Sequence, residues 1–235
     1  MICRIQASFI LIVFIYIFFN IDSLFGQKNP CHQNKLTHEE YDSLIKEYGQ
    51  IQFRIDFKNV IVYNFSDNKG DFIFECISEK GPYLLENKDS AISRIQILNY
   101  RIVDHKLIET LSFSDKALPD FVVGVRSILF LEDYISFCDL NDDSIVDPII
   151  VYYAQSSMTI VLFYGEDKII IENSFIGYHE QTLNISSKFY NLPFKVQEKV
   201  KALMIRMESD SIGHFPEKWQ NKMNAKKLLI KKSVH

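Results

Sequence analysis

After the N-terminal segment, the first stretch with a regular hydrophobic pattern has the period of a helix. In THEEYDSLIKEYG, residues 37–49, Thr37 is followed three residues later by Glu40, the reciprocal capping pattern of a helix start. Gly49 supplies a stop signal at the other end. Between them, apolar positions recur on one helical face at Tyr41, Leu44, Ile45 and Tyr48. The pattern predicts an N-terminal helix.

The middle of the chain changes to a period of two. Short runs rich in β-branched and aromatic residues alternate with polar clusters such as SDNKG, the pattern of strands and turns. GED, at Gly165–Asp167, is typical of a hairpin turn. The predicted strands are QFRIDF, NVIVYNF, DFIFECI, ISRIQILNYRIV, KLIETLSF, SILFLEDYISF, DPIIVYYA, MTIVLFY and KIIIENSF. So many short strands in succession favour an antiparallel meandering sheet, curled or two-layered.

The last third of the chain returns to helical spacing. Pro193 precedes LPFKVQEKVKALMIRMESD at a position where its missing amide costs little. One face of this predicted helix carries Val196, Val200, Leu203, Met204 and Met207. In FPEKWQNKMNAKKLLIKK, a second apolar line contains Phe215, Trp219 and Met223, and we expect Trp219 to be a core anchor. Lys226, Lys227, Lys231 and Lys232 are expected on a solvated face near the end of this helix. The fold class predicted is α+β, with one N-terminal helix and two C-terminal helices.

The N-terminal segment differs from the rest of the chain. Arg4 is followed by the apolar run FILIVFIYIFF, which is short for a membrane span and typical of a signal peptide. Cleavage after Gly26 would leave a small residue before the cut. We therefore expect residues 1–26 to be a signal peptide, with an uncleaved membrane anchor as the alternative. Residues 27–235 are expected to form a single α+β domain, exported to the periplasm or the cell surface.

Charge and cysteine content narrow the picture further. The 235 residues include 26 Lys and Arg against 30 Asp and Glu, so the net charge of -4 favours no nucleic-acid partner. Cys3 lies in the predicted signal peptide, which leaves Cys31, Cys76 and Cys138, and an odd number permits at most one bridge. Cys76 and Cys138 lie in predicted strands, where either a bridge or two core thiols is possible.

The clearest candidate for chemistry is an acidic stretch between two predicted strands, DLNDDSIVD, residues 139–147. Alternate side chains of a tight loop can direct their oxygens to one centre, and Ca²⁺ takes six to eight oxygen ligands. The candidate ligands are Asp139, Asn141, Asp143, the backbone carbonyl of Ile145, and Asp147. We call this segment the acidic loop, and we predict a degenerate calcium site in it.

Two residues of the acidic loop depart from a full calcium loop. Ser144 occupies the sixth position, where glycine normally allows a positive φ, and Ile150 occupies the twelfth, where an EF-hand has glutamate. With strands on both sides, the loop is similar to the DxDxDGxxD loops of β repeats. The alternative is a polar turn whose Asp and Asn side chains bind their own backbone.

A catalytic interpretation has less support in the sequence. General acid–base chemistry needs two carboxylates with separated pKa values, and nothing selects Glu132, Asp133 or Glu172 as the partner of an aspartate in the acidic loop. The sequence has no GxSxG, HExxH, P-loop, dinucleotide fingerprint or CxxC motif. Its six histidines are scattered without ligand spacing. We assign no catalytic residue.

The order of four segments resembles a known family. DLNDDSIVDPIIVY, KIII, FYNLPFKVQEKVKALMIRM and HFPEKWQNKM resemble an uncharacterised family of exported bacterial proteins, of Bacteroidetes type, loosely labelled as surface polysaccharide biosynthesis proteins. In that family the loop reads close to DLDGDGxxDPIIVY, followed by an LP-x-x-[IV]-Q helix and an FP-x-x-W segment. The resemblance covers roughly residues 137–223. This chain has Asp142 and Ser144 where the family tends to have glycines.

The resemblance implies an envelope protein linked to surface glycan production or display, and it supplies no catalytic residue. We expect a non-enzymatic exported protein whose partner is an envelope protein or a surface glycan. The alternatives are a hydrolase acting on glycans or peptidoglycan, and a periplasmic inhibitor or immunity-type binding protein. A membrane contact is expected only through an uncleaved N-terminal segment.

Overall fold

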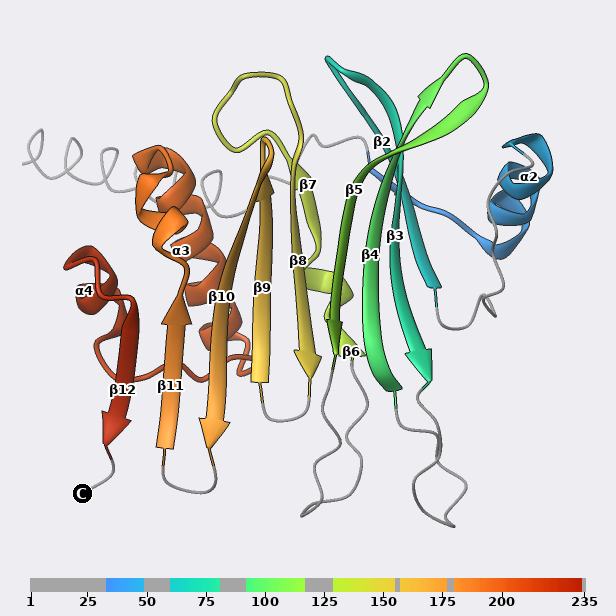
Figure 1. The fold of residues 1–235 in the computed structure, drawn as a ribbon. Coiled ribbons are helices and arrows are strands. Elements are labelled where there is room, and N and C mark those ends of the chain that lie inside the picture. Colours follow the sequence, from blue (N-terminus) through green and yellow to red (C-terminus); the bar gives the residue numbers. More distant parts are fainter. Residues whose placement is uncertain are drawn as a thin grey trace, which may run out of the picture. The chain divides into compact units, whose positions relative to one another are not determined.

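The computed structural model describes residues 33–48, 60–80, 92–116, 129–154, 157–176 and 180–233, which form two antiparallel sheets and flanking helices (Figure 1). A five-stranded sheet contains β1 (Asn34–Lys35), β2 (Val60–Asp67), β3 (Gly70–Lys80), β4 (Ile92–Val103) and β5 (Lys106–Lys116), in that order. Each strand pairs with the next one along the chain, so this sheet is a simple meander.

The second sheet has seven strands and the order β12-β11-β10-β9-β8-β6, with β7 also pairing with β8. Its strands are β6 (Leu129–Phe130), β7 (Ser136–Cys138), β8 (Asp147–Ala154), β9 (Ser157–Tyr164), β10 (Asp167–Ile176), β11 (Glu180–Ile185) and β12 (Leu229–Ser233). The predicted turn between β9 and β10 is present, and Gly165 there has a φ of 59°, which glycine adopts without steric cost.

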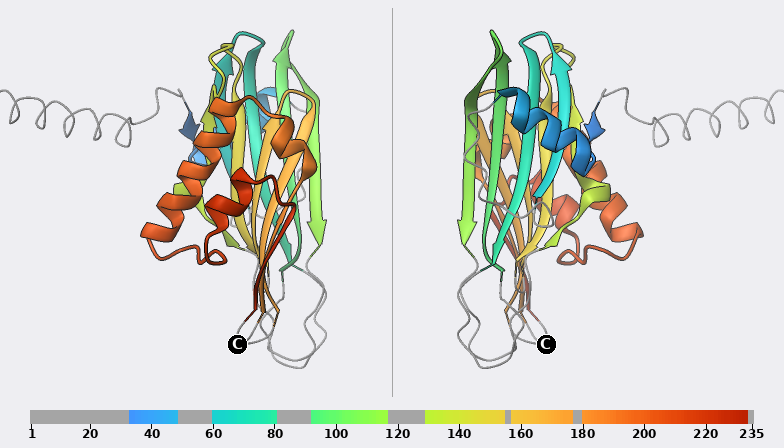
Figure 2. Two further views of the ribbon diagram at one scale, coloured as in Figure 1. Left: turned by 90° about the vertical axis from the view of Figure 1, so that its left-hand side faces the viewer. Right: turned by 90° about the vertical axis from the view of Figure 1, so that its right-hand side faces the viewer.

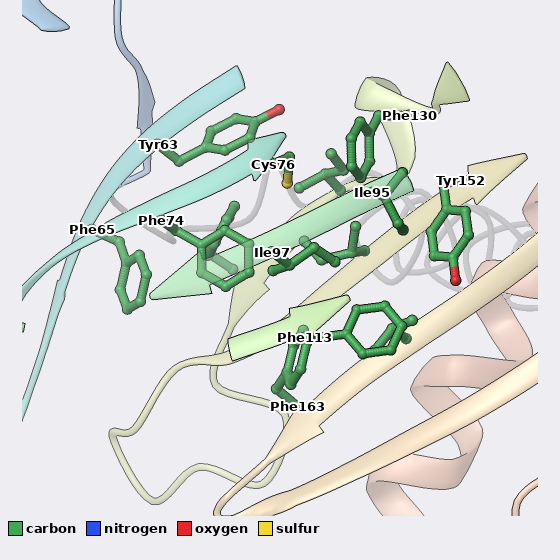
Figure 3. Close-up of a cluster of buried hydrophobic side chains, with 14 of the residues drawn as sticks. Tyr63, Phe65, Phe74, Cys76, Ile95, Ile97, Phe113, Phe130, Tyr152 and Phe163 are labelled. Atoms are coloured by element: carbon green, nitrogen blue, oxygen red, sulfur yellow. The ribbon is translucent and has the colours of Figure 1, made fainter. Parts of the chain in front are cut away.

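The main hydrophobic core lies between the inner faces of the two sheets (Figure 3). The ring of Phe137 lies at its centre, with centroids of Tyr63, Phe65 and Phe74 at 5.0, 5.1 and 4.9 Å. Such tilted and edge-on contacts are the favoured geometries of aromatic pairs. The buried members are Tyr63, Phe65, Phe72, Phe74, Cys76, Ile95, Ile97, Phe113, Phe130, Ile135, Phe137, Ile150, Tyr152, Val161 and Phe163.

A smaller core lies on the other face of the five-stranded sheet, under the helix α2 (His38–Tyr48) (Figure 2). The predicted capping box is present, because the Thr37 amide donates to Glu40 Oε2 at 2.8 Å and the Glu40 amide donates to Thr37 Oγ1 at 3.3 Å. The buried residues of this small core are Leu36, Tyr41, Val60, Val62, Ile73, Ile77 and Leu98.

Two C-terminal helices, α3 (Phe194–Ser209) and α4 (Trp219–Asn224), lie beside the seven-stranded sheet (Figure 2). The predicted apolar face of α3 is confirmed at Val196, Val200, Met204 and Met207, and Leu203 is partly buried. Trp219 is 3% exposed, its ring centroid lies 5.3 Å from that of Phe215, and its Nε1 donates to Glu208 at 3.2 Å. Trp219 is therefore a core anchor, as predicted.

The predicted α+β fold is confirmed: the described residues form two antiparallel sheets, one N-terminal helix and two C-terminal helices. Two predictions of local structure were wrong in detail. SILFLEDYISF does not form one strand, because β6 and β7 are separated by a short 3₁₀ helix at Glu132–Tyr134. Tyr134 turns inward there and donates a hydrogen bond to Asp210 at 2.7 Å, which an extended strand would not allow.

The second correction concerns the chain after α4. The helical pattern was predicted to run on through the terminal lysines, yet α4 ends at Asn224 and residues 229–233 form β12. Lys226 has a φ of 55°, which ends the helix, and Ile230 then pairs with Leu183 of β11 and is buried. Pairing with the edge of an existing sheet satisfies the backbone of this segment, and this outweighs its helical pattern.

Several predictions fall outside the described residues: the signal peptide at 1–26, its cleavage point, Cys31, Gly49 and the QFRIDF strand. Cys76 and Cys138 are buried and are not joined to each other, which agrees with the interpretation as core thiols. Among the residues that the structure describes, no helix is long and apolar enough to cross a membrane.

Candidate functional site

The acidic loop joins β7 to β8 (Figure 1). Its backbone is wrapped around the carboxylate of Asp139. Its backbone turns so that four consecutive amides donate to this one side chain. Oδ1 accepts from the amides of Asn141, Asp142 and Asp143, and Oδ2 accepts from the amide of Ser144. Hydrogen bonds to a charged acceptor are stronger than neutral ones, so Asp139 holds the loop in this shape.

Two residues of the loop adopt the left-handed conformation. Asp142 has a φ of 66° and Ser144 a φ of 65°. A residue with a Cβ pays about 1 kcal/mol or more in this region, and glycine does not. These are the two positions at which the resemblance inferred from the sequence implies glycine. The loop of this chain therefore has the backbone shape of a glycine-containing loop without the glycines.

The side chains of Asn141 and Asp143 complete the turn. Asn141 Nδ2 donates to Asp143 Oδ2 at 2.8 Å and to the hydroxyl of Tyr164 at 2.9 Å. Asp143 Oδ1 accepts from the amide of Ile145 at 2.8 Å, and the Asp143 amide donates to Asn141 Oδ1 at 3.2 Å. The predicted alternative of a turn whose side chains bind their own backbone is therefore present in the structure.

Asp147 closes the loop from its other end. It is the first residue of β8, is 2% exposed, and accepts a hydrogen bond from the Leu140 amide at 2.9 Å. Burial raises the pKa of Asp147 to about 6; the Leu140 amide opposes this shift, whereas Asp143 and Asp139 add to it. Asp147 is thus the candidate ligand that is most withdrawn from solvent.

Contacts beyond the loop join both sheets and α3 to it. The Val146 amide donates to Asp67 Oδ2 at 3.1 Å, and the Asn68 amide donates to the Ser144 carbonyl at 3.1 Å, so the β2–β3 turn packs on the loop. From α3, Lys195 pairs with Asp142, and Lys199 Nζ donates to the Asp139 carbonyl at 3.1 Å. The loop is therefore a structural junction.

The donor set suits a hard cation in chemistry, since all five predicted ligands offer oxygen. The side-chain oxygens of Asp139, Asn141 and Asp143 accept hydrogen bonds from within the loop. Within the described ranges, no three His, Cys, Asp or Glu side chains gather closely enough to hold a metal ion. The Ca²⁺ ligand set of Asp139, Asn141, Asp143, Ile145 and Asp147 therefore stays a prediction.

The carboxylates considered as catalytic partners have structural neighbours of their own. Glu132 pairs with Lys35 of β1, and Glu172 accepts a hydrogen bond from Ser174 at 3.0 Å. Asp133 contributes its backbone carbonyl to Arg206 of α3 at 3.3 Å. These contacts tie local elements together and do not select any of the three residues for catalysis.

Sequence reasoning missed the most unusual carboxyl group of the described residues. Glu75 lies in the middle of β3 and is 0% exposed, and neither of its carboxyl oxygens has a hydrogen-bond partner among the described residues. Burial raises the pKa of Glu75 to about 8. The signal was available in the sequence, because a lone acidic residue interrupts the apolar run FIFECI.

Comparison of the chain with protein-family models, with curated proteins and with solved structures returned no match.

Proposed function

We propose that this protein is an exported, non-enzymatic component of a bacterial envelope that supports surface polysaccharide assembly or display by binding a glycan or an envelope partner. The observation that carries the proposal is the acidic loop. Its Asp139 carboxylate accepts four backbone amides, and two lysines of α3 contact the loop from outside. Such an arrangement favours a rigid surface feature over a carboxylate poised for proton transfer.

The motifs behind the resemblance have local structural roles that support the proposal. In the LP-x-x-[IV]-Q segment, Gln197 Nε2 donates to the Leu192 carbonyl at 2.8 Å and Val196 is buried. In the FP-x-x-W segment, the Trp219 amide donates to the Pro216 carbonyl at 3.1 Å. These residues position α3 and α4, so a chain that keeps them also keeps the surface that the helices frame.

The surface we propose for the partner is the first turn of α3 beside the acidic loop. Phe194 is 74% exposed, the largest exposed fraction among the exposed large hydrophobic side chains of the described residues. The next residue, Lys195, pairs with Asp142, so this turn lies beside the loop. An exposed aromatic ring beside polar and acidic groups offers both an apolar face and hydrogen-bond acceptors to a sugar or a peptide.

Deletion and complementation test the proposal. We expect deletion of the gene in its host to reduce surface polysaccharide, measured by staining with a lectin or a polysaccharide antibody, and wild-type protein to restore it. Phe194→Ala is expected to complement poorly while keeping a wild-type melting temperature. Ile205→Ala is the matched control, because Ile205 is a 43% exposed residue of the same helix and lies away from the loop in sequence. Unchanged surface polysaccharide in the deletion strain would contradict the proposal.

The role of calcium is tested separately on the purified protein. Thermal melting is measured with Ca²⁺ and with EDTA, for the wild type and for Asp139→Ala. A predicted structural calcium site requires a higher melting temperature with Ca²⁺ for the wild type, and no such increase for the variant. Equal melting of the wild type in both buffers would exclude the ion site and leave the binding function untouched.

A further inference from the structure

Glu75 occupies the centre of the small core between the five-stranded sheet and α2. In the sheet register it lies opposite Val62 of β2 and Leu98 of β4. Along β3, the residues that share its face are Ile73 and Ile77, which are both 1% exposed. Its carboxyl group is therefore surrounded by apolar side chains on the face that α2 covers.

Among the described residues, the titratable groups that interact with Glu75 supply no positive charge. From α2 the neighbour is Tyr41, on which Asp42 also acts, and from β4 the neighbour is Tyr100. Burial, and then the carboxyl of Glu75, raise the pKa of both tyrosines, so they stay neutral at physiological pH. The remaining groups are Glu109 of β5, which acts on Tyr100, and Cys76, whose pKa is raised by burial.

An ionised carboxylate in this environment would be expensive. A buried charge without a counter-ion or hydrogen bonds costs several kcal/mol, and proteins usually avoid this by keeping the group neutral. Both Glu75 oxygens lack a hydrogen-bond partner among the described residues, which is consistent with a neutral acid. Loss of the proton therefore favours any state in which water reaches the carboxyl group.

The element that is easiest to lift from Glu75 is α2. Among its residues whose side chains are described, Tyr41 is buried and Leu44 is partly buried, whereas most others are exposed. The capping bonds between Thr37 and Glu40 are local to the helix and do not tie it to the sheet. Releasing α2 thus exposes little apolar area compared with separating the two sheets.

We propose that Glu75 and α2 form a pH-sensitive latch, in which α2 is docked on the five-stranded sheet while Glu75 is protonated and is released when Glu75 loses its proton. Release uncovers an apolar face of the sheet formed by Val62, Ile73, Ile77 and Leu98. The latch is independent of the proposed function at the acidic loop, which lies between β7 and β8.

The latch is tested by hydrogen exchange of the α2 amides in the full chain, measured from pH 4.5 to 9 and corrected for the intrinsic exchange rate. The opening constant of α2 is expected to rise by up to tenfold per pH unit between about pH 4.5 and 8 and then to level off, because a single proton is released. Glu75→Gln removes the ionisable group and is expected to give an opening constant independent of pH. Glu75→Leu is the second variant with the same expectation.

Two controls keep the test specific. Glu109→Gln removes an exposed carboxyl of the same sheet and is expected to keep the wild-type pH dependence. The amides of β9, in the other sheet, report global unfolding, and their opening constant is expected to stay well below that of α2 at every pH, although it shares the same pH dependence. The proposal is overturned if Glu75→Gln or Glu75→Leu keeps the pH dependence, if Glu109→Gln loses it, or if α2 and β9 have the same opening constant.

Discussion

Asp139 and Glu75 show two opposite ways of placing a carboxyl group in this protein. The Asp139 carboxylate is partly exposed and accepts four backbone amides from its own loop. The Glu75 carboxyl is fully buried, and no group of the described residues donates to it. The first group is held by backbone hydrogen bonds, and the second is favoured as a neutral acid by its surroundings.

The difference shows what a carboxyl group contributes in each place. The four backbone amides that donate to Asp139 order the loop locally, because unwinding the loop would break all of these hydrogen bonds. Burial of Glu75 instead makes the stability of the fold depend on pH, because the folded state binds the Glu75 proton more tightly than the unfolded state does. The acidic loop is therefore a rigid part of the structure, whereas the stability of the region where α2 covers β3 depends on the pH of the solvent.

The largest effect is expected at Glu75. Its pKa rises from 4.5 to about 8 on folding, so its contribution to stability is fully present below about pH 4.5 and is lost as the pH rises to about 8. The free energy of unfolding should fall with pH by up to about 1.4 kcal/mol per unit in this window. Glu75→Gln should remove this slope in urea titrations measured at several pH values. An unchanged slope in the variant would show that other groups cause it.

The next effect is expected at Asp139. Asp139→Ala leaves the amides of residues 141–144 without their acceptor, and the free energy of unfolding should fall by about 3 kcal/mol, since hydrogen bonds to charged groups are the stronger class. Urea denaturation at one pH measures it. If Asp139→Ala were as stable as the wild type, the loop would not depend on this carboxylate.

A smaller gain in stability is expected at Ser144. Ser144 has a φ of 65°, so Ser144→Gly should relieve the strain of a Cβ and raise the free energy of unfolding by about 1 kcal/mol. Ser144→Ala keeps the Cβ and is the matched control, with no gain expected. Differential scanning calorimetry compares the three proteins, and a stabilised alanine variant would contradict this explanation.

The smallest effect is expected at Asp142. Its ion pair with Lys195 joins two exposed side chains, and such pairs contribute about 1 kcal/mol or less. Asp142→Asn keeps a residue that tolerates the left-handed conformation and should change the free energy of unfolding by less than about 0.5 kcal/mol. Equilibrium denaturation at low and high salt checks this. A loss as large as that of Asp139→Ala would mean that charge alone holds the loop.

Local patterns in the sequence predicted most elements of the fold. Thr37 and Glu40 mark a helix start through hydrogen bonds between residues only three positions apart, and the predicted strand DPIIVYYA is found at Asp147–Ala154. The two strands missed in the seven-stranded sheet, β11 and β12, have fewer apolar residues. They form because an existing sheet edge satisfies their backbone, and this information is not local.

The candidate site shows the same division. The spacing of its aspartates predicted a tight loop between strands, and the structure contains that loop with a positive φ at Ser144. The contacts of the loop with Asp67, Tyr164 and Lys199 join residues far apart in the chain, and no local pattern predicts them.

The sequence by itself determined the hydrophobic period of most elements, the helix caps and the turns, because these features depend on neighbours within a few residues. Only the tertiary structure decided which carboxyl groups are paired and which are buried without a partner. In sequence, Glu75 is one acidic residue in an apolar strand, and its environment is set by α2 folding over β3. Desolvation depends on everything that packs around a group, so the raised pKa of Glu75 arises only in the folded chain.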